Sequence, residues 1–220
     1  MPRCRAFKPD TGLKNKIIGA LATRTDGAST TVIEKHLPRE YSEWAKVRIL
    51  NDGDTVHAST MVKRGQDKRD QTYVRVSACL RRYIYKSFLL CTTHQYETFV
   101  DKNARSRKKR VELELQTFYG RLEHIISFSL DSDDAISDLD LDGPTNFVFA
   151  AIRLCAVNTR ATNERLDIHY YPSYGALDVV DIKCIQCVVG RVPIPEGGVE
   201  KWALVDRSGS LARAVAVDDV

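Results

Sequence analysis

The sequence lacks a long apolar run and an export signal. Its longest apolar stretch, around Phe147 to Ile152, is far shorter than the roughly 20 residues that a membrane-spanning helix needs. The start of the chain, MPRCRAFKPDTGLK, has no apolar segment behind its basic residues, which a secretory signal requires. We therefore expect a protein without a membrane partner that is not secreted and works in the nucleus or the cytoplasm.

The sequence also lacks the specific motifs of catalysis and cofactor binding. It contains no GxSxG nucleophile elbow, no P-loop and no GxGxxG dinucleotide fingerprint. Its cysteines have scattered spacing that does not indicate a disulfide framework, so we expect free thiols in a reducing compartment. The six cysteines are Cys4, Cys79, Cys91, Cys155, Cys184 and Cys187. We predict no catalytic residue, no cofactor and no metal site.

Two weaker patterns leave an alternative open. Cys184-x-x-Cys187 resembles half a zinc knuckle, but residues three apart on a strand point to opposite faces, which favours two packed thiols. Asp167-x-His169 has the spacing with which a metal triad of two histidines and a carboxylate begins. The alternative function is therefore a small β-barrel enzyme or metal-binding protein that uses His169 and its neighbours.

What the sequence does contain is a strong β pattern. The stretch Leu166 to Arg191 has two apolar, β-branched runs around the turn Pro172-Ser-Tyr-Gly175, which predicts a hairpin. Further strands are predicted at Gln116 to Leu130, with a bulge or sharp bend at Gly120, and at Asn146 to Val157. Two more are predicted near the end of the chain, at Trp202 to Asp206 and Leu211 to Val217. We therefore predict a mainly β fold, with a small antiparallel β-barrel or sandwich in residues 112–220.

The first part of the chain is predicted to be simpler. Residues 1–38 are basic and weakly periodic, which indicates a flexible, solvated arm, with a short helix near Lys14 to Ala22 as an alternative. Residues 39–75 are predicted to be a β-hairpin region, with the hairpin itself over 41–63. Its paired strands are expected at Trp44 to Leu50 and Thr55 to Val62, around the turn Asn51-Asp-Gly53.

Residues 76–95, VSACLRRYIYKSFLLCTTHQ, fit neither a helical stripe nor strand alternation. Val-Ser can be encoded GTG-AGT and Gln can be encoded CAG, which are the common start and end of a spliceosomal intron. The segment also preserves the reading frame. We hypothesise that it is a translated, retained intron, and that the intended chain runs from Arg75 directly into Tyr96. The alternative is an ordinary amphipathic helix.

The charges are unevenly placed. The linker 96–111 contains a basic run of six cations within nine residues, and the rest of the chain is slightly acidic. Such a run has the composition of a nuclear localisation signal and can neutralise phosphates. The predicted nucleic-acid-binding residues, which could also be a solvated linker, are Lys102, Arg105, Arg107, Lys108, Lys109 and Arg110.

Two other features concern binding. Tyr119 and Trp202 are candidate stacking surfaces for single-stranded nucleic acid, although packing in the core is favoured for both. The stretch Asp131 to Asp142 holds six aspartates in twelve residues. Because they lie in one stretch, they indicate a solvated acidic loop and not the dispersed carboxylates of a metal-dependent transposase.

A family resemblance rests on the segments EWAKVRILNDGDTVHAS, TFYGRLEHI, LDIHYYPSYGALDVVDIKCIQCVVGRV and WALVDRSGSLARAV. Together they resemble an uncharacterised protein family associated with DNA transposons in mushroom-type fungi, and the second is similar to a β-domain beside transposases of plant CACTA-type elements. The resemblance skips 76–95. It implies a non-catalytic, transposon-derived module that binds DNA, RNA or other transposon-encoded proteins. A decayed transposon fragment without selected function is a further alternative.

Overall fold

The computed structural model describes residues 4–25, 28–49, 54–62, 70–76, 99–101, 113–115, 117–157, 162–163, 166–196 and 199–206. The described chain is mainly β, as predicted, and all its strand pairs are antiparallel. None of its helices is long and apolar enough to cross a membrane. The basic run and most of the segment 76–95 lie outside the described residues, as does the expected terminal strand from Leu211.

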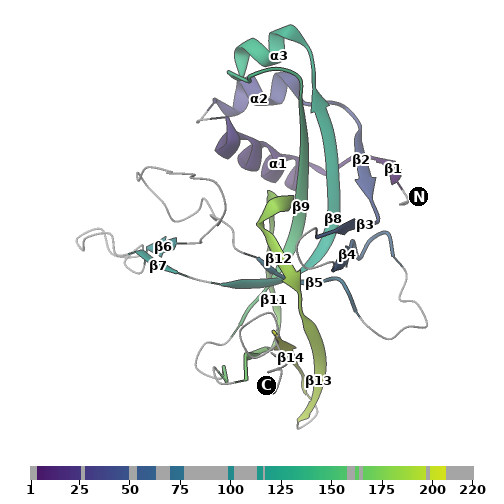
Figure 1. The fold of residues 1–220 in the computed structure, drawn as a ribbon, viewed down its shortest axis with the longest axis vertical. Coiled ribbons are helices and arrows are strands. Elements are labelled where there is room, and N and C mark those ends of the chain that lie inside the picture. The colour runs from purple at the N-terminus through teal and green to yellow at the C-terminus, as the bar shows by residue number, and fades with distance from the viewer. Residues whose placement is uncertain are drawn as a thin grey trace, which may run out of the picture.

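The largest sheet is organised around β8 (Phe118–Leu130), which pairs from Gly120 to Leu130 with β9 (Thr145–Cys155). The other edge of β8 is shared by β5 (Tyr73–Val76) near its start and β2 (Tyr41–Trp44) near its end. Figure 1 shows this long central pair. The expected strands over 116–130 and 146–157 are therefore confirmed.

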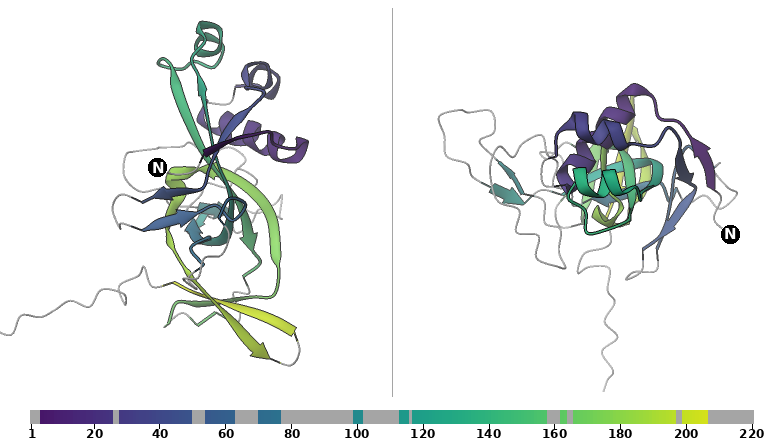
Figure 2. Two further views of the ribbon diagram at one scale, coloured as in Figure 1. Left: turned by 90° about the vertical axis from the view of Figure 1, so that its right-hand side faces the viewer. Right: turned by 90° about the horizontal axis from the view of Figure 1, so that it is seen from above.

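The outer strands of this sheet show how strongly it curls. Strand β11 (Tyr174–Asp181) pairs with β9, and β12 (Ile185–Val188) pairs with β5 on the opposite side. Only one turn of 3-10 helix, η2 (Ile182–Cys184), separates β11 from β12. The two sides must therefore approach each other, as the curved ribbon in Figure 2 shows. The pairings found among the described residues do not form a closed barrel.

Helices cover one face at the far end of β8 and β9. Helix α1 (Thr11–Arg24) begins at Asp10, whose carboxylate accepts a hydrogen bond from the Leu13 amide at 2.7 Å. Helices α2 (Thr30–His36) and α3 (Asp133–Asp138) begin at serine caps in the same way. Their apolar residues form one core with Ile126, Phe128, Phe147 and Phe149 of the sheet.

The prediction of a solvated arm over 1–38 is therefore wrong for the described part of that segment. Strand β1 (Cys4–Phe7) pairs with β2, and α1 buries Leu13, Ile17, Ile18 and Leu21 against the sheet. The physical reason is that four apolar side chains at helical spacing form a stripe that outweighs the polar composition around it. The expected acidic loop likewise contains a short helix, because Ala135 and Leu139 are buried.

A second sheet has three strands, in the order β10 (Ile168–Tyr171), β14 (Val199–Val205) and β13 (Gly190–Glu196). The hairpin predicted around Pro172 is wrong, because β10 pairs with β14 whereas β11 pairs with β9. The turn is present, but it passes the chain from one sheet to the other. Figure 1 shows β13 and β14 below the central pair.

The predicted hairpin over 41–63 is confirmed in part. Strands β3 (Lys46–Arg48) and β4 (Thr55–His57) pair, with Val47 opposite Val56. Strand β2 lies before them and belongs to the main sheet. One further pair, β6 (Phe99–Asp101) with β7 (Leu113–Leu115), forms a two-stranded sheet of its own.

Candidate functional site

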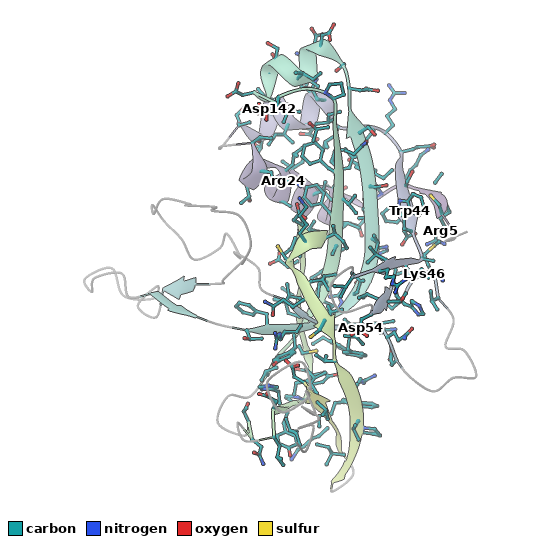
Figure 3. The ribbon with its side chains drawn as sticks, in the orientation of Figure 1. Arg5, Arg24, Trp44, Lys46, Asp54 and Asp142 are labelled. Atoms are coloured by element: carbon teal, nitrogen blue, oxygen red, sulfur yellow. The ribbon has the colours of Figure 1, made fainter. Side chains whose placement is uncertain are left out.

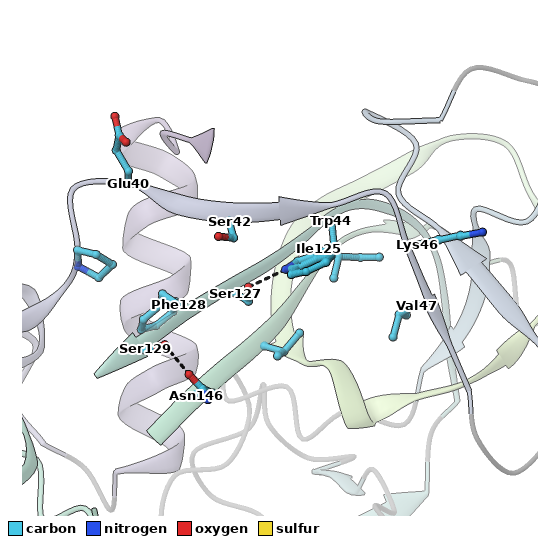
Figure 4. A pocket seen from close by; sticks show the side chains of 12 residues that line it. Glu40, Ser42, Trp44, Lys46, Val47, Ile125, Ser127, Phe128, Ser129 and Asn146 are labelled. Atoms are coloured by element: carbon cyan, nitrogen blue, oxygen red, sulfur yellow. Dashed lines mark hydrogen bonds between the residues drawn. The ribbon is translucent and has the colours of Figure 1, made fainter. Parts of the chain in front are cut away.

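An open groove of about 600 Å³ crosses the face of the main sheet that α1 does not cover. Alternate residues of β8 point to opposite faces, so Ile126 packs in the helical core while Ser127 and Ser129 line the groove. Figure 4 shows the groove between β2, β8 and β9. Small hydroxyl side chains leave the sheet surface open there, which produces a concave site over these strands.

The groove contains an indole held in one position. Trp44 Nε1 donates a hydrogen bond of 2.7 Å to Ser127 Oγ on the neighbouring strand. The residue paired with Trp44 is Ile125, so the side chain reaches diagonally across β8, as Figure 4 shows. Ser129 Oγ donates to Asn146 Oδ1, which leaves the Asn146 amide nitrogen as a donor. An aromatic surface therefore lies beside polar donors.

The charges at the groove do not cancel. Glu40 forms an ion pair with Lys8, at 3.1 Å between Oε1 and Nζ. Lys46 forms no ion pair within the described part of the chain, so it leaves one positive charge at the groove. Figure 3 shows Trp44 and Lys46 on the same side of the molecule. The groove can thus accept a ligand with a planar ring, hydrogen-bond acceptors and a negative charge.

His169, the residue predicted as a possible metal ligand, lies in a different place, between the two sheets. The Tyr119 hydroxyl donates to Asp206 Oδ2 at 2.9 Å, and its oxygen lies 2.9 Å from His169 Nε2. Because the phenol proton is used on Asp206, His169 must donate through Nε2, which fixes its tautomer. Arg75 completes the network with a 3.1 Å bond to the same carboxylate oxygen.

The electrostatics of this network favour a structural role. Burial and the nearby Asp206 carboxylate raise the pKa of Tyr119, so its phenol stays protonated and is a poor nucleophile. Burial also lowers the pKa of His169, against the opposite effect of Asp167 and Asp206. In the part of the chain that the structure describes, no three His, Cys, Asp or Glu residues are grouped so that they could hold a metal ion.

A second polar cluster surrounds Glu43, whose side chain is fully buried. Its carboxylate lies 2.6 Å from His124 Nδ1 and accepts hydrogen bonds from Thr60 and Arg5 at 2.7 Å. Burial by itself would raise the pKa of Glu43, but the bonds from Thr60, His124 and Arg5 hold it below its usual value. The cluster links β1, at the edge of the main sheet, and the segment after β4 to β2 and β8.

The other predicted residues are dispersed. Cys184 lies in η2 and not on a strand as expected, and Cys187 lies on β12; the two thiols are buried in different apolar clusters. Tyr119 is buried, as favoured. One face of Trp202 is covered by the Arg191 guanidinium, 3.3 Å above the ring, so that face offers no stacking surface.

Sequence reasoning missed Trp44 and Glu43 as site residues. Their signal is the alternation in Tyr41-Ser-Glu-Trp44, in which Tyr41 and Glu43 are buried on one face and Ser42 and Trp44 line the other. The neighbouring residues in the sequence do not reveal which groups would pair with a buried Glu43. The His124, Thr60 and Arg5 side chains come from distant segments.

Comparisons with protein families, curated proteins and solved structures found no match to this chain. The resemblance to transposon-associated proteins therefore stays a prediction.

Proposed function

We propose that the protein is a non-catalytic nucleic-acid-binding module whose main contact is the basic run Lys102–Arg110. The observation that carries the proposal is the position of this run in the chain. Along the chain it connects β6 to β7, which pair with each other and with no other strand that the structure describes, and which lie to the side of the main sheet in Figure 1. In the sequence, six cations thus lie between the two strands of a small, separate pair.

The physical basis is the release of counterions from the phosphate backbone. Each phosphate that a lysine or arginine neutralises frees condensed cations, so affinity falls steeply as salt is raised. The rest of the chain carries a slight net negative charge, so the basic run is its main concentration of positive charge. The same run fits a nuclear location, which we propose with it.

The groove around Trp44 supports the same proposal. A flat indole, amide and hydroxyl donors and the ammonium group of Lys46 are the kinds of group that contact bases and phosphates. The groove therefore supplies a second surface for the same class of ligand.

As the scaffold we propose a nearly closed antiparallel barrel made by β5, β8, β9 and the bent segment β11 to β12. It is supported by the single turn η2, which joins strands on opposite sides of the sheet. Such curvature leaves few free strand edges, which limits self-association through edge pairing.

The test is binding of fluorescent DNA and RNA by the full chain between 50 and 300 mM salt. We expect a steep linear fall of log K with log salt concentration. Replacing Arg107, Lys108, Lys109 and Arg110 by Gln should reduce that slope by roughly 3 to 4 and weaken binding about tenfold or more at 0.1 M salt.

The matched control replaces two arginines and two lysines outside the basic run. Arg39, Arg48 and Lys183 are exposed and Lys16 is half-exposed, and their replacement by Gln changes the net charge equally. We expect a much smaller effect, through general charge alone, because none of these four residues belongs to the basic run or lines the Trp44 groove. Equal losses in both variants, or binding that does not depend on salt, would contradict the proposal.

A further inference from the structure

The register of the β5–β8 pair and the register of the β6–β7 pair differ by a fixed number of residues. In the first pair, Tyr73 lies opposite Arg121 and Val76 opposite Phe118. In the second, Phe99 lies opposite Leu115 and Asp101 opposite Leu113. In any antiparallel ladder, each step forward along one strand is a step back along the other. Extending the first ladder beyond Val76 would therefore place position 79 opposite Leu115.

The residue that does lie opposite Leu115 is Phe99 and not position 79. The offset between positions 79 and 99 equals the length of the segment 76–95, which stands out from its surroundings by sequence alone. The possible intron ends in the sequence and the strand register thus give the same length.

On the side of the ladder formed by β7 and β8, the two strands follow each other almost directly in the sequence. Leu115 ends β7 and Phe118 begins β8, so only positions 116 and 117 separate them. The extra length is therefore confined to the strand side formed by β5 and β6. An insertion into one strand of a continuous hairpin produces this asymmetry.

We infer that residues 76–95 interrupt a single β-hairpin. In a chain without them, Tyr73–Arg75 would continue directly into Tyr96–Asp101 and pair along the whole of Leu113–Arg121. Such an arm is about 30 Å long. Tyr96 takes the place of Val76 opposite Phe118, and the basic run connects the two strands at the far end of the arm.

The sequence and the side-chain alternation agree with this arrangement. Tyr96-Glu-Thr-Phe-Val100 is rich in residues that favour strands. An insertion of even length keeps every side chain on its face of the sheet, whereas one of odd length would reverse the faces. The segment 76–95 has an even length, so its removal restores both the pairing and the alternation.

This inference deepens the proposed function and rests on it for the role of the arm. With the segment removed, the basic run is held at the end of a continuous two-stranded ribbon, and the major groove of duplex DNA admits such a ribbon. With the segment retained, the ribbon is broken between β5 and β6. Retention or removal of 76–95 would thus regulate how firmly the basic run is presented to duplex DNA.

The experiment compares three chains: the full chain, a deletion of 76–95, called the in-register deletion, and a deletion of 77–95, called the shifted deletion. The shifted deletion keeps Val76 and so moves the ladder by one position. The measurement is amide hydrogen exchange in β6 and β7, at the amides that point toward the partner strand, with exchange in the β8–β9 ladder as the check on folding. We expect at least tenfold slower exchange in the in-register deletion than in the other two chains.

Equal exchange in the two deletions, or loss of the β8–β9 ladder in the in-register deletion, would overturn the inference. Binding to a short DNA duplex is measured on the same chains. A protected arm without tighter, salt-dependent binding supports the hairpin and counts against the proposed function. A protected arm with tighter binding in the in-register deletion supports both.

Discussion

At the scale of single residues, Gly120 controls how closely β8 approaches β9. A Cβ atom at this position would lie 2.8 Å from the Arg153 backbone oxygen and would collide with the Ile152 side chain. We therefore expect Gly120→Ala to lower the free energy of unfolding by about 1 to 3 kcal/mol, the usual cost of overpacking a core. Urea denaturation followed by circular dichroism measures this change.

Gly19 in α1 provides the control, because a Cβ there would meet no atom within 4 Å. Gly19→Ala should stabilise the protein by about 0.5 to 1 kcal/mol, since alanine favours the helix. Equal effects of the two substitutions would show that the close approach at Gly120 is not what requires glycine.

The same position shows what sequence can reveal about a residue. The glycine within a strand pattern predicted a bulge or bend at Gly120. The irregularity in the ladder occurs instead between Leu122 and His124, and the strand continues through Gly120. A glycine marks a place that tolerates no side chain, but the close contact that excludes one comes from Ile152 on β9, which is distant in the sequence.

At the scale of elements, α1 tests whether the start of the chain belongs to the fold. Ile17 is fully buried in the core between α1 and the sheet. Ile17→Ala should therefore cost about 2 to 5 kcal/mol of unfolding free energy, because it leaves a cavity. Lys16→Ala, at the adjacent half-exposed position, should stay within about 0.5 kcal/mol. If Ile17→Ala and Lys16→Ala both had small effects on thermal unfolding, the start of the chain would be a solvated arm after all.

Local pairings were predictable and distant ones were not. The β3–β4 hairpin follows from alternation around a short turn, and the structure confirms it. The turn at Pro172 was recognised too, but β10 pairs with β14, much later in the chain, instead of with its neighbour β11. A turn motif fixes where a strand ends. Which strand lies beside it depends on packing between segments that no local pattern describes.

At the scale of the whole molecule, the Tyr119 network joins the two sheets. Tyr119 and Arg75 belong to the main sheet, whereas His169 lies on β10 and Asp206 at the end of β14. The sequence singled out His169 only as a possible metal ligand, from its spacing to Asp167. The partners that the structure supplies are Tyr119 and Asp206, which no sequence spacing connects.

The network should therefore make the two sheets unfold together. Tyr119→Phe removes the hydroxyl that bonds Asp206 and His169, and we expect a loss of about 1 to 3 kcal/mol at pH 7.5. Tyr170→Phe is the control, since the Tyr170 hydroxyl makes no hydrogen bond within the described chain and its loss should change stability by less than about 0.5 kcal/mol. The measurement is urea denaturation followed by tryptophan fluorescence, because Trp44 and Trp202 report on different sheets.

The dependence of stability on pH provides a second test of the Tyr119–His169 contact. Burial lowers the pKa of His169 below its usual value of 6.5, so the unfolded chain binds the proton more readily than the folded one. The contribution of neutral His169 to the free energy of unfolding is therefore complete above about pH 6.5, and it is lost as the pH falls towards the pKa of His169 in the folded protein. Wild-type protein should thus be less stable at pH 5 than at pH 7.5. If the two tryptophans report separate transitions already at pH 7.5, the network does not couple the sheets.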